Sequence, residues 1–239
     1  VKLKIYPENI VLENSLKIFE NSIFLISGNE ETYIKKIEQC FISSFRSMGF
    51  DLVEKISSTK INKDYNFQHN SQELFNKKKI IIYYNPKDID LDYLDTVFDD
   101  SIKIIIVHTD LKATSKIKKF FDSTKKLISI SCYTLTEESK KLFLNNFLSK
   151  NNVKLDSDSY WFFLLKSPNQ YQLFENEMFK LLDLGKKEIL FNDIEHLMPS
   201  YEKKEFDSLF FIILKNQKEI ILETQKTLTS LQDSFYFHQ

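Results

Sequence analysis

The fold of this chain is decided by residues 24–32, which read Phe24-Leu25-Ile26-Ser27-Gly28-Asn29-Glu30-Glu31-Thr32. An apolar run gives way here to a short polar turn, and two acidic residues then begin an amphipathic segment. That segment, Glu30 to Met48, has a helical apolar stripe and ends before Gly49, a residue that suits a helix C-terminus. The stretch therefore predicts a buried strand followed directly by a helix. The stripe consists of Tyr33, Ile34, Ile37, Phe41 and Phe45.

The same alternation continues through the first half of the chain. Amphipathic segments at Asp88 to Phe98 and Ser115 to Phe121 predict two shorter helices between further apolar runs. Strands that alternate with helices indicate right-handed crossovers and a mainly parallel sheet covered on both faces, which is an α/β fold. The five predicted strands are Ile23 to Ser27, Leu52 to Ile56, Ile80 to Tyr84, Ile102 to Val107 and Leu127 to Ser131.

The second half predicts helices only. Thr136-Glu137-Glu138 begins the first of them, with a capping residue followed by two acids. From Lys203 onward, recurring apolar residues from Phe206 to Leu228 indicate one or two further helices that need a packing partner. The helices expected in between are Asp156 to Leu165, Gln170 to Leu184 and Phe191 to Met198, with Pro168, Gly185 and Pro199 near their ends.

Composition and charge exclude several classes of protein. With 42% hydrophobic and 28% charged residues the chain is globular, and a net charge of −1 provides no overall field for nucleic acid or membrane. Cys40 and Cys132 lack the spacing of a metal or redox motif, so we expect both to be buried in a reduced, cytoplasmic protein. No apolar run is long enough for a signal peptide or a membrane span, so we expect no membrane partner.

The first strand-to-helix turn is where a nucleotide would bind, because a helix N-terminus offers free backbone amides to phosphate. A phosphate loop needs GxxxxGK[ST], whereas Ser27 to Thr32 has one glycine, no lysine and two acids. Glu30 and Glu31 suit a helix cap but would repel a triphosphate. The position for a magnesium-binding acid, after the third strand, holds Asn85 and Pro86. We therefore expect no cofactor, no metal site and no intrinsic catalysis.

Three other polar or aromatic groups have a functional and a structural interpretation. His108-Thr109-Asp110, at the end of the fourth strand, is a remnant sensor, a catalytic cluster, or simply a turn with a helix cap. Lysine groups at Lys77 to Lys79, Lys116 with Lys118 and Lys119, and Lys125 with Lys126 contact phosphates or are solvated. Tyr160-Trp161-Phe162-Phe163 stacks bases or packs in the helical part. In each case we prefer the structural interpretation.

The apolar pair Leu74-Phe75 stands at the end of a polar segment, Ser71 to Asn76, just before the strand at Ile80. Residues directly before a parallel strand lie at the rim of the sheet, which faces water. The pair therefore either closes the edge of the core or is an exposed wedge for another protein's pocket.

Taken together, the chain resembles the delta subunit of the bacterial DNA polymerase III clamp loader over nearly its full length. Leu74-Phe75, followed by basic residues and a strand, is similar to the clamp-contacting element of that family. Phe24 to Glu30 resembles the opening strand and degenerate loop of the family, and Ile104 to Val107 with Ser115 to Lys118 resembles its fourth strand and next helix. Its second-domain signature is matched by Glu177-Met178-Phe179-Lys180-Leu181 followed by Phe191-Asn192-Asp193-Ile194.

The resemblance implies three domains: an AAA+-like α/β domain without a phosphate loop (1–134), a small helical lid domain (135–200) and the start of a truncated collar domain (201–239). It implies a non-catalytic subunit of the DNA polymerase III holoenzyme that binds and opens the sliding clamp during DNA replication, with Leu74 and Phe75 as the wedge. The implied partners are the clamp (beta subunit), the delta prime and tau/gamma subunits, and primed DNA through the assembled loader.

Two alternatives remain open from the residues alone. One is an ATP-binding AAA+ or other doubly wound α/β enzyme that uses His108 and Asp110. The other is a plain DNA-binding protein, which the neutral net charge disfavours.

Overall fold

A computed structural model describes residues 5–13, 17–57, 60–61, 78–96, 100–112, 114–124 and 126–198, all of which belong to one compact unit, Val1–Met198. The predicted wedge and the helices predicted after Lys203 lie outside the described residues. The domain boundaries at residues 134 and 200 remain predictions.

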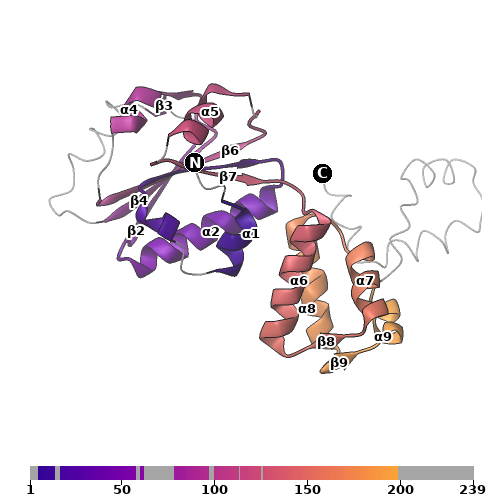
Figure 1. Cartoon of the computed structure of the whole chain (residues 1–239). Coiled ribbons are helices and arrows are strands. Elements are labelled where there is room, and N and C mark those ends of the chain that lie inside the picture. Colours follow the sequence, from indigo (N-terminus) through magenta and orange to yellow (C-terminus); the bar gives the residue numbers. More distant parts are fainter. Residues whose placement is uncertain are drawn as a thin grey trace, which may run out of the picture. The chain divides into compact units, whose positions relative to one another are not determined.

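Five parallel strands form the sheet at the centre of this unit (Figure 1). Their order is β2-β4-β6-β1-β7, so β1 lies between β6 and β7, and every neighbouring pair is parallel. The five predicted strands and the α/β fold class are therefore confirmed. The strands are β1 (Ile23–Gly28), β2 (Leu52–Ser57), β4 (Lys79–Tyr84), β6 (Ile102–Thr109) and β7 (Ile128–Cys132).

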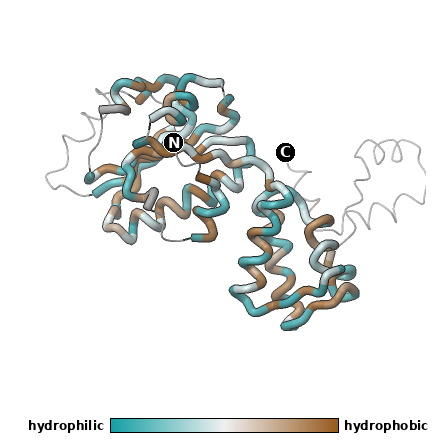
Figure 2. The backbone as a smooth tube through the Cα atoms, viewed as in Figure 1, coloured by the Kyte–Doolittle hydropathy of each residue, from teal (hydrophilic) through white to brown (hydrophobic). Residues whose placement is uncertain are grey.

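Helices cover both faces of the sheet. In Figure 1, α1 (Pro7–Leu12) and α2 (Glu31–Ser47) lie on one face, and α4 (Leu91–Thr96) and α5 (Lys116–Ser123) lie on the other. In β1, β4 and β6, alternate residues enter two separate apolar clusters, one on each face, whereas the buried residues of β7 all belong to the cluster that contains α2. Burial on both faces explains why β1, β4 and β6 are nearly continuous apolar runs, where brown dominates in Figure 2, while α2 alternates between brown and teal.

The main helix, α2, agrees with its sequence pattern. All five residues of the predicted stripe are buried, and Phe41 packs at 4.7 Å between ring centroids against Phe24 of β1. The side chain of Glu30 caps its N-terminus, and Gly49 follows its end with a φ of +87°. The helix α1, which begins at a proline, was not predicted from the sequence.

One predicted helix begins later than expected. Asp88–Ile89 form a short strand, β5, that pairs with β3 (Lys60–Ile61), and α4 starts only at Leu91. The side chain of Asp90 explains this start, because its Oδ1 accepts a hydrogen bond from the backbone N–H of Tyr93 (3.0 Å). The prediction of a helix from Asp88 was therefore wrong at its first turn.

The remaining described residues are mainly helical, as predicted. Thr136 and Asp156 cap two of the helices, each accepting a hydrogen bond from a backbone N–H three residues later. A two-residue parallel pair, β8 (Lys154–Leu155) with β9 (Glu188–Ile189), is too short to show in a hydrophobic pattern. Phe143, Phe163 and Phe174 belong to the same apolar cluster as α2, so one core joins the sheet and the helices. The helices are α6 (Glu137–Asn151), α7 (Ser157–Lys166), α8 (Tyr171–Asp183) and α9 (Phe191–Leu197).

Candidate functional site

The turn between β1 and α2 is fixed by backbone contacts to the two neighbouring strands. A β-carbon on Gly28 would lie 1.8 Å from the carbonyl oxygen of Cys132, and the φ of Gly28 is +152°. The carbonyl oxygen of Gly28 accepts a hydrogen bond from the backbone N–H of Asp110 (2.9 Å). The carbonyl oxygen of Cys132 accepts one from the backbone N–H of Glu30 (3.3 Å). Glycine is therefore required at position 28, and the turn is tied to the ends of β6 and β7.

The side chain of Glu30, a residue of this turn, caps the N-terminus of α2. Its side chain is buried, and Oε2 accepts hydrogen bonds from the backbone N–H of Tyr33 (2.9 Å) and the hydroxyl of Thr32 (2.8 Å). Backbone amides in the first turn of a helix, such as that of Tyr33, are the groups that hold phosphate in nucleotide sites, and the helix dipole favours negative charge there. A carboxylate of the chain itself takes that position, so a phosphate would have to displace it.

The same carboxylate reaches a second helix. The backbone N–H of Tyr171, the first residue of α8, donates to Glu30 Oε2 (3.3 Å), and that of Gln172 donates to Thr32 Oγ1 (3.2 Å). The local cap residue of α8, Gln170, makes no side-chain capping bond. Sequence patterns missed this contact because caps are recognised within a few residues, whereas these partners come from opposite halves of the chain.

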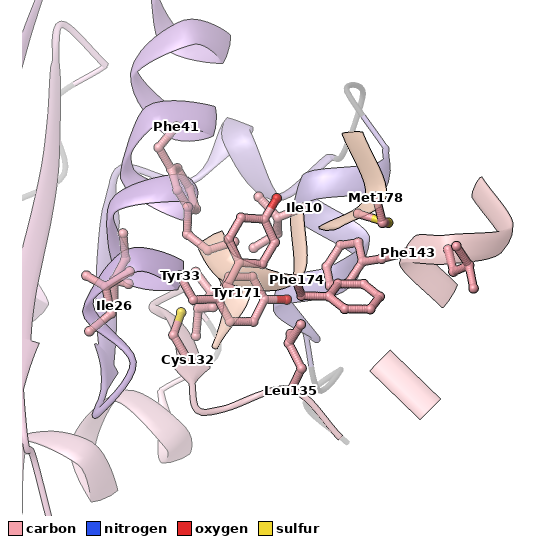
Figure 3. Packing of buried hydrophobic residues seen from close by; sticks show 14 of the residues in the cluster. Ile10, Ile26, Tyr33, Phe41, Cys132, Leu135, Phe143, Tyr171, Phe174 and Met178 are labelled. Carbon is pink, nitrogen blue, oxygen red and sulfur yellow. The ribbon is translucent and has the colours of Figure 1, made fainter. Parts of the chain in front are cut away.

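Aromatic rings from α2, α6 and α8 pack against one another close to this turn, among them those of Tyr33, Phe143 and Tyr171 (Figure 3). The rings of Tyr33 and Tyr171 are stacked, with centroids 4.8 Å apart and an interplanar angle of 3°, and Phe143 meets both edge-on. Burial raises the pKa of both tyrosines, and the carboxylate of Glu8 raises that of Tyr33 further. The region next to the turn is thus a packed core.

Polar groups at the ends of β4 and β6 bond to one another. Asn85 has a φ of +46°, and its Oδ1 accepts hydrogen bonds from the backbone N–H (2.9 Å) and the hydroxyl (3.2 Å) of Thr109. His108 Nδ1 lies 2.9 Å from the carbonyl oxygen of Thr109. Among the described residues, no hydrogen bond or ion pair joins His108 to Asp110. The arrangement supports the interpretation of this strand end as a turn.

Some members of the other groups noted in the sequence make contacts within the protein. Lys118 Nζ lies 2.5 Å from Ser129 Oγ and 2.9 Å from Ser131 Oγ, so it is anchored on β7. In the aromatic run, Phe163 is fully buried, whereas Trp161 is 52% exposed with Lys141 Nζ 4.7 Å from its ring centroid. The core interpretation therefore holds for Phe163 and not for Trp161.

The predicted wedge residues, Leu74 and Phe75, lie outside the described residues, as do Lys77 and Lys125. In the ranges that are described, no group of three or more His, Cys, Asp or Glu side chains is placed to hold a metal ion. None of the described helices combines the length and apolar character needed to span a membrane.

Comparisons by fold identify similar proteins, while no family model and no curated sequence matches the chain. The Bacillus subtilis DNA clamp loader delta protein is 14% identical, with a TM-score of 0.55 over 91% of this chain and 70% of that one. The chain shares the fold of that delta protein. Two structures are less similar. The Thermotoga maritima RuvB Holliday junction branch migration motor is 13% identical, with a TM-score of 0.45 over 80% of this chain and 68% of that one. Domain III of the Thermotoga maritima replication initiation protein DnaA is 15% identical, with a TM-score of 0.39 over 80% of this chain and 89% of that one. The likeness to the delta protein agrees with the α/β fold expected from the sequence.

Proposed function

We propose that this chain is a non-catalytic subunit of a DNA polymerase III clamp loader, which binds the sliding clamp and opens it for loading onto DNA. The shared fold with the delta protein supports this role. The observation that carries the proposal is the position of Glu30, whose carboxylate takes the place of a phosphate in the turn. An AAA+-like fold with that position filled suits binding better than nucleotide hydrolysis.

In this proposal, Leu74 and Phe75 are the wedge that contacts the clamp. Burying a Leu or Phe side chain in a preformed pocket contributes roughly 1.5 to 3 kcal/mol each, which is enough for an anchor within a larger interface. A wedge that binds the open ring more tightly than the closed ring shifts the clamp toward the open state, and this requires no bond chemistry. The delta prime and tau/gamma subunits, and primed DNA in the assembled loader, are the further partners of this role.

Titration calorimetry of the full chain with the sliding clamp of the same organism, and separately with ATP, tests the proposal. We expect saturable clamp binding without nucleotide and no ATP binding at micromolar concentration. ATP binding without clamp binding would favour the α/β enzyme instead. Binding of DNA alone, with an affinity that falls steeply with salt, would favour the plain DNA-binding protein.

A further inference from the structure

The N-termini of two long helices from distant parts of the sequence meet at one carboxylate. Glu30 Oε2 accepts hydrogen bonds from the backbone N–H of Tyr33 in α2 (2.9 Å) and of Tyr171 in α8 (3.3 Å). Thr32 extends the contact, because its hydroxyl donates to Glu30 and accepts from the backbone N–H of Gln172 (3.2 Å). Two helix dipoles therefore direct their positive ends at one buried negative group.

The helix α8 depends on this contact for its cap. Its first turn contains no acidic residue, and Gln170 provides no side-chain bond to the free amides. The acceptors for Tyr171 and Gln172 come instead from Glu30 and Thr32. Without them, both amides would lose their partners, and that of Tyr171 would do so at a buried residue, whereas Gln172 is exposed.

The contact between α2 and α8 continues one turn further along both helices. Lys36 Nζ lies 2.8 Å from Glu175 Oε1, and the hydroxyl of Tyr171 donates to the same oxygen (2.8 Å). Both charged side chains are partly covered, at 31% and 17% exposure. This ion pair and the stacked rings of Tyr33 and Tyr171 align the helices, while Glu30 joins their ends.

We propose that Glu30 is a built-in substitute for an anionic ligand. Its carboxylate holds the α6 to α9 helices against the sheet in one arrangement that requires no bound nucleotide. It follows that removing the carboxylate opens a site for a small inorganic anion between the N-termini of α2 and α8. This inference concerns contacts within the chain and does not depend on clamp binding.

Hydrogen exchange at the amides of Tyr171 and Gln172, measured by NMR in the full chain, tests the proposal. In Glu30→Ala, we expect exchange at Tyr171 to become about tenfold faster or more, because its acceptor is lost. Inorganic phosphate at millimolar concentration should slow this exchange again and raise the Tm of the variant while leaving the wild type unchanged. Glu31→Ala is the matched control, because Glu31 also lies in the first turn of α2 but is exposed.

Two results would overturn the proposal: unchanged exchange at Tyr171 in Glu30→Ala, or an equal phosphate effect on variant and wild type. Thr32→Val provides a second test if Glu30→Ala does not fold. It removes the acceptor of the Gln172 amide and leaves that of Tyr171. Hydrogen exchange should then accelerate more at the Gln172 amide than at the Tyr171 amide. If the substitution changed the exchange rate of neither amide, the result would contradict the account.

Discussion

The ring of Tyr33 lies parallel to the ring of Tyr171, with 4.8 Å between their centroids. The two hydroxyl groups differ, although the rings are stacked. That of Tyr171 donates to Glu175 (2.8 Å), whereas that of Tyr33 is buried without a hydrogen-bond partner in the described part of the chain. Substituting each tyrosine in turn therefore separates two effects on stability: that of burying a phenol, and that of the hydrogen bond its hydroxyl makes.

Tyr33→Phe should leave stability at pH 7 nearly unchanged, within about 0.5 kcal/mol, because no hydrogen bond is lost. Burial raises the pKa of Tyr33, so the folded protein keeps a proton that the unfolded chain loses from about pH 10. The contribution of Tyr33 to stability is complete below pH 10 and falls at higher pH, by up to about 1.4 kcal/mol per pH unit. Urea unfolding at pH 7 and pH 11 should show that the variant loses less stability than the wild type, and an equal alkaline loss would contradict the prediction.

Tyr171→Phe is the companion to that experiment. The substitution removes a donor from Glu175, so we expect a cost of about 1 to 2 kcal/mol at pH 7. Burial also raises the pKa of Tyr171, so this variant should likewise lose less stability at alkaline pH. Equal stability of both Phe variants at pH 7 would show that the bond to Glu175 contributes nothing.

Gly28→Ala should destabilise the fold by about 3 kcal/mol or more, because the new methyl group meets backbone atoms of β7 that cannot move aside. Gly49→Ala is the control: it also has a positive φ, but nothing lies within 4 Å of its β-carbon position. We expect it to cost about 1 to 2 kcal/mol. Thermal unfolding of both variants compares them, and similar losses would mean that the close approach at Gly28 is unimportant.

Asn85→Ala should cost about 1 to 3 kcal/mol, because the backbone N–H of Thr109 loses its acceptor and alanine is disfavoured at a φ of +46°. Asn85→Asp retains the acceptor oxygen and should be closer to the wild type. Denaturant unfolding measures both. A larger loss in the Asp variant than in the Ala variant would refute the role assigned to this oxygen.

The sheet could be predicted from the sequence because burial on both faces leaves a strong local signal. Runs such as Ile80 to Tyr84 and Ile102 to Val107 are apolar throughout, and their observed strands differ from the predicted ones by only one or two residues. The short pairs β3 with β5 and β8 with β9 were missed because two residues cannot display a period. At Asp88, the favourable acidic start of a helix was outweighed by pairing with Lys60.

The candidate site was predicted only in part. Local rules identified Glu30 as a helix cap and excluded a phosphate loop, since both follow from neighbouring residues. The contact of Glu30 with Tyr171 depends on how two distant helices pack, and no local pattern contains it. The assignment of Leu74 and Phe75 as a wedge remains a prediction.

The affinity of the Leu74→Ala/Phe75→Ala variant for the sliding clamp of the same organism tests the central claim most directly. The matched control is Leu165→Ala/Phe179→Ala, which removes the same two residue types from exposed positions on α7 and α8. We predict that the wedge variant loses at least about a hundredfold in affinity, equivalent to about 2.7 kcal/mol, with an unchanged Tm, while the control binds like the wild type. Wild-type affinity of the wedge variant would contradict the account.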